Sequence, residues 1–159
     1  LQKNDMHVEA AIIKMELTAF SDRIATQLSG GEQARALIAR ALAQDTPILM
    51  ADEPTASLDP ANQISTLKIF SELAQTGRGI IASIHDLGLA ARYCTKLALL
   101  DRGKLVAFGS ADVVLTPDNL RTVFSIEAHY KNTKQGVIFQ PLSVLKKSNK
   151  NFALGDTLK

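Results

Sequence analysis

Short continuous apolar runs that alternate with helical segments constrain the fold of this chain more than any other feature of its sequence. The runs cover residues 48–51, 79–84 and 97–100, and each is followed by polar or turn residues. Runs of this length and composition are typical of strands buried on both faces. Between them, apolar side chains recur at helical spacing over 64–73 and 87–93. Buried strands that alternate with helices predict a parallel sheet built by crossovers, and so an α/β fold.

Further elements are predicted around these strands from helical spacing and turn residues. They are a helix over 7–17, a helix ending near Gln44 with one apolar stripe of Leu37, Ile38, Ala41 and Leu42, a strand over 104–108 paired as a hairpin with the run before it, and short helices over 111–115 and 117–124. The residues from 125 onward show little pattern.

The composition suits one compact domain. With 46% hydrophobic and 21% charged residues, the chain is neither disordered nor fibrous, and no apolar run approaches the ~20 residues that span a bilayer. Residues 1–5 contain neither a secretion signal nor an initiator Met, which indicates an internal start. The one cysteine, Cys94, cannot form an internal disulfide and falls in a predicted helix, which fits a reducing compartment.

The net charge of +2 is unevenly distributed. Residues 131–159 hold six Lys and one Asp, a local charge of +5, whereas the preceding residues carry −3. A basic tail can contact nucleic acid or anionic lipid. No aromatic or Arg cluster accompanies this one, so we predict a solvated tail and no nucleic-acid partner.

The first of four stretches that can carry chemistry is the sequence LSGGE over 28–32. Ser29 and Glu32 have the spacing of a capping box, in which each side chain binds a backbone N–H of the first helical turn. A cap does not require the adjacent Gly30 and Gly31, which would let an anion approach the N–H groups at the positive end of the helix. A plain cap and an anion site both remain open.

The second stretch places two carboxylates, Asp52 and Glu53, after the first predicted strand. The C-terminal edge of a parallel sheet is where α/β proteins bind ligands. Adjacent residues on an extended chain point in different directions, so one carboxylate can hold a metal while the other meets water. The alternative is that both merely end the strand in solvent.

The last two stretches also have structural explanations. Asp59 is a natural N-cap and Pro60 a natural first helical residue, which suffices to explain residues 57–60. His85 follows the second predicted strand and precedes Asp86, which can cap the next helix. A lone histidine at a strand end is more often structural than catalytic, but the predicted sheet brings this one to the edge that carries the two carboxylates.

In this order and spacing, the four stretches resemble the nucleotide-binding subunits of ABC transporters. Residues 28–32 (LSGGE) are similar to the signature loop of that family, 48–53 (ILMADE) to its Walker B strand with the catalytic glutamate, 57–59 (SLD) to its D-loop and His85 to its switch histidine.

The resemblance covers about residues 20–123 and implies a partial P-loop NTPase-type parallel sheet with flanking helices, preceded by the end of a helical subdomain. On this basis, residues 1–28 are the end of the helical subdomain, 29–124 are the C-terminal part of the ATPase core, and 125–159 are a C-terminal extension.

The resemblance also implies a role for each matching residue. Asp52 would hold Mg²⁺ through its water shell, Glu53 would polarise the attacking water, and His85 would contact the γ-phosphate of ATP. The remaining residues would bind the ATP held by the second ATPase subunit of a head-to-tail pair. They are Ser29, Gly30, Gly31, Glu32 and Asp59. Such an arrangement suits phosphoryl transfer, because positioning and electrostatic stabilisation supply most of its catalysis.

One motif of the family is absent from the 159 residues. Walker A reads G-x-x-x-x-G-K-[ST], and its amides cradle the phosphates, but the only Gly-Lys pair is Gly103-Lys104, which is followed by Leu105. The family places this loop, the strand before it, the adenine-stacking aromatic and the glutamine loop upstream of residue 1. We therefore expect the C-terminal part of such a subunit, inactive alone and marginally stable because its sheet lacks partners.

Residues after the second predicted strand indicate a branch of the family. Residues 85–94, Gly103, 108–109 and 115–117, followed by Phe124, resemble importers of iron–siderophore, haem or cobalamin type. This implies an ATP-hydrolysing motor at the cytoplasmic face of the bacterial inner membrane, held there indirectly by transmembrane permease subunits. The alternatives are a non-transport ABC ATPase acting on DNA or ribosomes, which typically carries long coiled coils or a second cassette, and a non-catalytic remnant.

Overall fold

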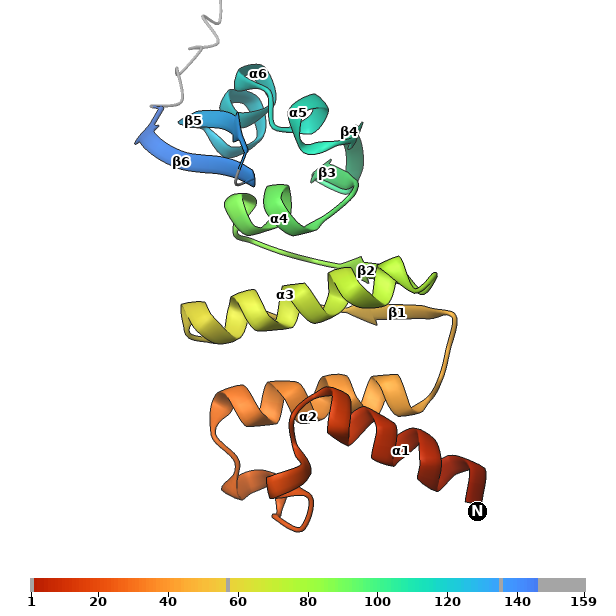
Figure 1. Cartoon of the computed structure of the whole chain (residues 1–159). Helices are drawn as coiled ribbons and strands as arrows, with labels where there is room; N and C mark the ends of the chain where they lie inside the picture. Colours follow the sequence, from red (N-terminus) through yellow and green to blue (C-terminus); the bar gives the residue numbers. More distant parts are fainter. Residues whose placement is uncertain (1, 57, 135, 146–159) are drawn as a thin grey trace, which may run out of the picture. The chain divides into compact units, whose positions relative to one another are not determined.

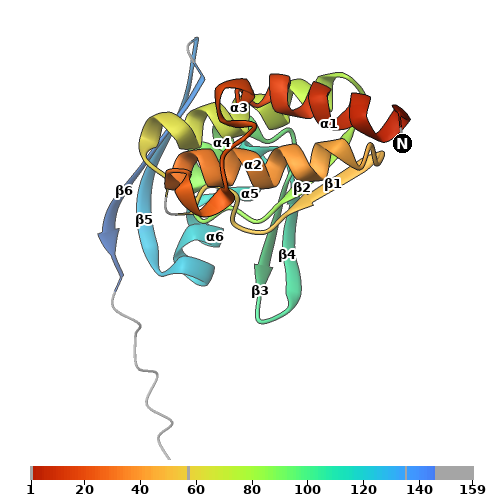
Figure 2. The same cartoon turned by 90° about the horizontal axis from the view of Figure 1, so that it is seen from below.

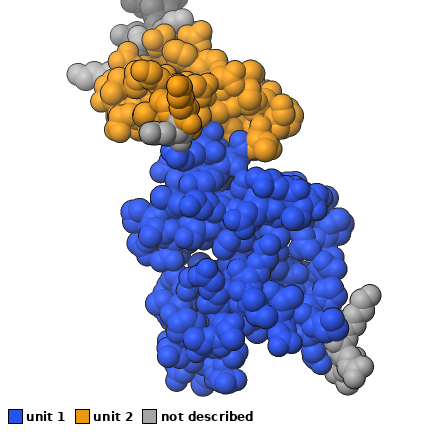
Figure 3. All heavy atoms as spheres, in the orientation of Figure 1, with its two compact units in different colours: residues 1–94 blue, residues 95–159 orange. Residues whose placement is uncertain are grey.

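The computed structural model describes residues 2–56, 58–134 and 136–145 of the chain (Figure 1). The chain forms two compact units, residues 1–94 and 95–159, which Figure 3 shows in different colours. The division thus falls after Cys94. The boundaries at 28/29 and 124/125 stay predictions, since they follow the subdomains of a family rather than the compactness of this chain.

In the first unit, helices alternate with two parallel strands. The elements are α1 (Gln2–Lys14), the 3₁₀ turns η1 (Thr18–Phe20) and η2 (Ala25–Gln27), α2 (Gly30–Ala43), β1 (Ile48–Ala51), α3 (Pro60–Gln75), β2 (Gly79–Ala82) and α4 (Leu87–Tyr93). Strand β1 pairs with β2 in parallel, and α3 lies in the connection between them (Figures 1 and 2). The predicted α/β class and parallel pairing are confirmed.

A hydrophobic core joins the helices of this unit to β1. Its members are Ala11, Met15, Leu17, Ile38, Ala39, Leu42, Leu49, Leu67, Phe70 and Leu73. The predicted apolar stripe on α2 is correct for Ile38 and Leu42 but wrong for Leu37, which is 57% exposed. Consecutive residues of a helix lie about 100° apart around its axis, and the stripe that buries Ile38 and Ala39 leaves Leu37 at its outer edge.

The prediction that the strands are buried on both faces is wrong. Leu49 of β1 is buried, but its neighbours Ile48 and Met50 are 54% and 74% exposed, and Ile81 of β2 is 56% exposed. Successive side chains of a strand point to opposite faces. Among the described residues of the first unit, the core covers only one of these faces. A short apolar run has the same appearance whether one or both of its faces are covered.

Local signals set both ends of α3. Asp59 caps its N-terminus and Pro60 takes its first position, as predicted. At the other end, Gly77 has a φ of +93°, and the N–H of Arg78 donates to the carbonyl of Leu73. This is the Schellman arrangement, in which a residue with positive φ, usually glycine, lets the chain leave the helix.

Replacing Leu67 of α3 by Ala should lower the free energy of unfolding of the chain by about 2–5 kcal/mol, because this side chain is 2% exposed in the core. Ile64→Ala is the matched control. The sequence placed Ile64 on the same buried stripe, but it is 38% exposed, so its loss should cost less than half as much. Urea unfolding followed by circular dichroism measures both, and equal losses would contradict the burial of this helix.

The second unit contains two hairpins and short helical turns. The elements are β3 (Leu97–Asp101), β4 (Lys104–Gly109), α5 (Ala111–Val114), α6 (Pro117–Asn119), the π-helical turn η3 (Leu120–Phe124), β5 (Ile126–Thr133) and β6 (Gly136–Val144). The predicted hairpin of β3 with β4 and the predicted short helices are confirmed. Figure 2 shows this hairpin with its turn.

Strand β3 was also expected to join the parallel sheet, and this is wrong within the described part of the chain, where it pairs with β4 alone. Arg102 and Gly103 connect the two strands with φ values of +48° and +74°. Two residues with positive φ form the tight turn that matches the twist of antiparallel strands. The local turn therefore fixes β4 as the neighbour of β3.

The hairpin of β5 and β6 was not predicted. The two strands pair antiparallel, with Ile126 opposite Val144 and Thr133 opposite Gly136. Side chains of β5 alternate between half-buried and exposed positions over most of the strand, but polar residues interrupt the apolar alternation and hide it in the sequence. Residues 146–159, which hold four of the six lysines of the predicted basic tail, lie outside the described residues.

The sequence suggested that Cys94 lies within a helix. In the structure, Cys94 instead follows Tyr93, the last residue of α4, as the C-cap of that helix. Its side chain is partly buried, and burial raises the pKa of its thiol.

In the part of the chain that the structure describes, no helix has the length and apolar character needed to cross a bilayer.

Candidate functional site

Helix α2 begins with the predicted capping box. The backbone N–H of Ser29 donates to Oε2 of Glu32 at 2.7 Å, and the N–H of Glu32 donates to Oγ of Ser29 at 3.4 Å. The bond from the Ser29 backbone, helped by its hydroxyl and by Arg23 and Arg35, lowers the pKa of Glu32. Apart from the chain neighbours of Gly30 and the backbone of the helix itself, no atom of the described residues lies within 4 Å of the position that a Cβ on Gly30 would occupy, so the helix start is open on that side.

Gly31 contacts the first turn of α3. A Cβ at Gly31 would lie 2.8 Å from Nδ2 of Asn62, so a larger residue would have to displace this amide. The same Nδ2 donates a hydrogen bond to Oδ2 of Asp59. Asn62 therefore connects the start of α2 with the residue that caps α3.

Asp59 caps α3 through Oδ1, which accepts the N–H groups of Ala61 and Asn62 at 3.0 Å each. Hydrogen bonds from the backbone and side chain of Asn62 lower the pKa of Asp59, because they stabilise its ionised form. The predicted cap is confirmed. Ser57, which belongs to the same predicted stretch, lies outside the described residues.

One hydroxyl at the end of β2 contacts both acidic residues that follow β1, the first through its carboxylate and the second through its backbone N–H. Ser83 Oγ donates to Oδ1 of Asp52 at 2.5 Å and accepts the backbone N–H of Glu53 at 2.8 Å. The parallel register explains this contact, since Ala51 lies opposite Ala82 and the next residue of each chain segment follows at the same sheet edge.

The carboxylate of Glu53 lies against His85, with Oε1 at 2.7 Å from Nε2. An ionised carboxylate only accepts hydrogen bonds, so Nε2 carries the proton in this contact. The side chains are 47% and 83% exposed, respectively, which leaves both accessible from solvent. Glu53 has a φ of +46°. Backbone conformations of this kind are unfavourable for residues other than glycine and cluster at functional sites.

The donor set at Asp52 fits a magnesium ion that keeps most of its water. Asp52 and Ser83 offer oxygen ligands, and Mg²⁺ usually takes one or two carboxylates together with substrate phosphates. Among the described residues, no group of three or more His, Cys, Asp or Glu side chains could hold a metal ion. The residues therefore do not fit a cation held by protein ligands alone.

The predicted site residues fall into two groups. Asp52, Glu53 and His85 meet at the ends of β1 and β2, whereas the start of α2 and the start of α3 meet through Gly31.

Two residues that hold these groups together were missed. Ser83 was assigned to a strand over 79–84, but β2 ends at Ala82, and a hydroxyl inside an apolar run was the available signal. Asn62 gave no signal in the sequence beyond its place three residues after the cap of α3.

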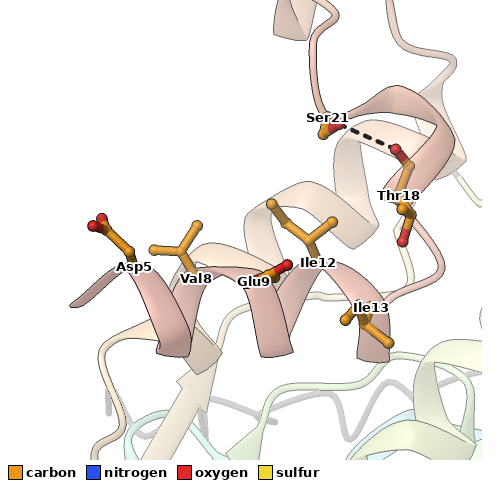
Figure 4. Close-up of a pocket in the computed structure, with 7 residues that line it drawn as sticks. All are labelled: Asp5, Val8, Glu9, Ile12, Ile13, Thr18 and Ser21. Carbon is orange, nitrogen blue, oxygen red and sulfur yellow. Dashed lines mark hydrogen bonds between the residues drawn. The ribbon is translucent and has the colours of Figure 1, made fainter. Parts of the chain in front are cut away.

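Two hollows on the first unit do not belong to this site. One, of about 290 Å³, lies beside α1 and the turn that follows it, and Figure 4 shows the residues that line it: Asp5, Val8, Glu9, Ile12, Ile13, Thr18 and Ser21. The other, of about 320 Å³, lies between α1 and α2. Neither is lined by a predicted site residue.

A family model described as ABC transporter matches residues 2–56, which include both the start of α2 and the carboxylates after β1. Over these residues, the chain is similar to the ABC transporter family. The resemblance read from the four stretches is thereby confirmed, although the match itself does not assign a role to any residue.

Curated relatives extend the similarity beyond the family model. A cobalamin import ATP-binding protein of Halobacterium salinarum is 48% identical over 118 residues, which are 74% of this chain and 30% of the relative. A hemin import ATP-binding protein of Nocardia farcinica is 42% identical over 121 residues, which are 76% of this chain and 42% of the relative. The chain thus spans less than half the length of these relatives.

Solved ABC structures share the fold. A transporter described as of the metal-chelate type, in an inward-facing conformation, matches with a TM-score of 0.76 and 29% identity over 87% of this chain and 57% of that one. A dimeric bacterial ABC transporter cassette matches with a TM-score of 0.60 and 29% identity over 67% of this chain and 46% of that one.

Proposed function

We propose that this chain is the C-terminal part of the ATP-hydrolysing motor of an ABC importer. The observation that carries the proposal is the meeting of Asp52, Glu53 and His85 at the ends of two parallel strands, with Nε2 of His85 at 2.7 Å from Oε1 of Glu53. The two carboxylates at this edge have separate hydrogen-bond partners, so they can perform separate tasks. Two residues that merely ended the strand in solvent would not need such partners.

In the proposed mechanism, Glu53 orients the attacking water and accepts its proton, as a general base within hydrogen-bond reach of the water does. The Nε2–H of His85 is a donor that can turn from Glu53 to a γ-phosphate oxygen. Its 83% exposed side chain leaves room for that movement. Stabilising charge on the terminal phosphate is the main contribution a protein makes to this reaction.

Asp52, oriented by Ser83, would hold Mg²⁺ through the water shell of the ion. The ion, when bound, neutralises charge on the phosphates. Asp52 itself would orient the water molecules around the ion, because the hydrogen bond from Ser83 fixes the direction of its carboxylate.

The signature residues would act on ATP held by a second ATPase subunit in a head-to-tail pair. The open start of α2 at Gly30 favours this, because helix N-terminal N–H groups attract anions. Ser29, Gly31 and Glu32 would complete the contact, with the capping box keeping the loop in shape. Asp59 would help to couple the two sites, and its link through Asn62 to Gly31 supports that role.

The transported molecule would be a haem, a cobalamin or an iron–siderophore complex, since relatives named for cobalamin and hemin import are 48% and 42% identical. The motor would work with transmembrane permease subunits and contact the membrane only through them, at the cytoplasmic face of the bacterial inner membrane. We expect no nucleic-acid partner.

A strain that lacks the gene for this chain should grow more slowly than the parent when haem, cobalamin or an iron–siderophore complex is the only source of a limiting nutrient. Both strains should grow equally when that nutrient is supplied in a form that does not require the importer. Growth curves on each source measure this, and the intact gene supplied in trans should restore growth. Equal growth of the two strains on all three sources would contradict the import function.

A further inference from the structure

The hydroxyl of Ser83 contacts both acidic residues of the proposed site, the carboxylate of Asp52 and the backbone N–H of Glu53. A hydroxyl has one proton to donate and lone pairs to accept with. The N–H of Glu53 can only donate, so Ser83 accepts this bond and directs its single proton to Oδ1 of Asp52. The bonding directions are therefore fixed by the chemistry of the partners.

The backbone of Glu53 needs support at this point. Its φ of +46° is unfavourable for a residue with a side chain, and such a conformation persists only where surrounding contacts hold it. The N–H of Glu53 is held by Ser83, and its carbonyl accepts the N–H of Ala56 at 3.0 Å. Together these bonds hold the turn that directs the Glu53 side chain to His85, while the preceding carboxylate stays with Ser83.

We propose that Ser83 is a positioning residue that fixes the direction of Asp52 and the backbone turn of Glu53 with one hydroxyl. The role rests on the proposed function for its effect on turnover, but not for its geometry. It differs from the role of His85, which contacts the Glu53 carboxylate alone. If Ser83 merely ended the strand, its replacement would change neither the direction of the Asp52 carboxylate nor the backbone turn of Glu53.

The geometry is tested in the 159-residue chain without nucleotide or metal. In Ser83→Ala, the Glu53 amide should exchange its hydrogen about tenfold faster in NMR hydrogen exchange, because its acceptor is lost. The amide of residue 83, which donates to the carbonyl of Ala51 at 3.1 Å, reports strand pairing and should stay unchanged. Ser83→Thr keeps the hydroxyl and should exchange as the wild type does.

Ser21→Ala is the matched control. It removes a hydroxyl that donates to the carbonyl of Thr18 at 3.1 Å in the hollow of Figure 4, away from the carboxylates, and should leave the Glu53 amide unchanged. If Ser83→Ala weakens the strands as a whole, Ser83→Cys keeps the volume while making only weak hydrogen bonds. An unchanged Glu53 amide in Ser83→Cys or Ser83→Ala, with the strands paired, would overturn the proposal.

The effect on turnover is tested in a polypeptide that joins this chain to a Walker A segment of a related subunit. Ser83→Ala should lower kcat, and raise the Mg²⁺ concentration for half-maximal rate, by about 10- to 100-fold, as the loss of a residue that orients a metal-binding side chain does. The KM for ATP at saturating Mg²⁺ should not change, and Ser83→Thr should restore the rate. Normal kcat and Mg²⁺ dependence in Ser83→Ala would overturn the role of Ser83 alone, whereas no hydrolysis by the unmodified polypeptide would overturn the proposed function.

Discussion

Replacing Glu53 by Gln in a polypeptide that joins this chain to a Walker A segment is expected to lower ATP hydrolysis by about 100- to 10,000-fold, the range that a general base contributes. The amide keeps the shape of the carboxylate but cannot accept the proton of the attacking water. The hydroxyl of Ser83 would still hold Asp52 and the Glu53 backbone, because neither bond involves the Glu53 side chain. Binding should therefore survive, and the ATP-bound dimer should accumulate.

Phosphate release measures the rate, and size-exclusion chromatography with and without ATP measures the dimer. Glu72→Gln is the matched control, since it makes the same chemical change at an exposed position of α3. Near-normal hydrolysis in Glu53→Gln, or failure of this variant to dimerise with ATP, would show that Glu53 is not the general base.

Three other variants separate the tasks within the site. Asp52→Asn should weaken Mg²⁺ binding itself. His85→Ala should still bind ATP and hydrolyse it slowly, since the base remains. Ser29→Arg should block the closed dimer, because a bulky side chain would stand at the open helix start where we expect the phosphate of the partner's ATP.

The isolated 159-residue chain is expected to bind Mg-ATP with a dissociation constant above about 1 mM, a loss of roughly 4 kcal/mol or more relative to micromolar binding. The phosphate-cradling loop supplies backbone amides and a lysine at the phosphates, and the 159 residues contain no such sequence. In the proposed arrangement, the contacts that would remain on this chain are a water-mediated metal site, the side chains of Glu53 and His85, and residues that act on the ATP of a partner.

Isothermal titration calorimetry measures this affinity, with the joined polypeptide as the positive control. The circular dichroism spectrum of the isolated chain should be recorded in parallel, so that weak binding is not confused with unfolding. Micromolar affinity of a folded isolated chain would mean that ATP binds by contacts other than those proposed.

The sequence by itself determined the features that depend on neighbours along the chain. The capping box of Ser29 and Glu32, the cap of α3 at Asp59 and the cap of α4 at Asp86 all join residues three or fewer positions apart, so spacing was enough to predict them. Apolar runs separated by helical segments likewise predicted the parallel pair of strands, and the motifs in order predicted the family.

Tertiary structure decided which distant residues meet. Ser83 reaches Asp52 across 31 positions and His85 reaches Glu53 across 32, and a shift of register by one residue would send these side chains to the other face of the sheet. The exposure of Met50 depends in the same way on where the core lies, because side-chain periodicity gives the two faces of a strand but not what covers them. Only the folded chain, by setting the register of β1 against β2, placed one hydroxyl between the carboxylate of Asp52 and the backbone N–H of Glu53.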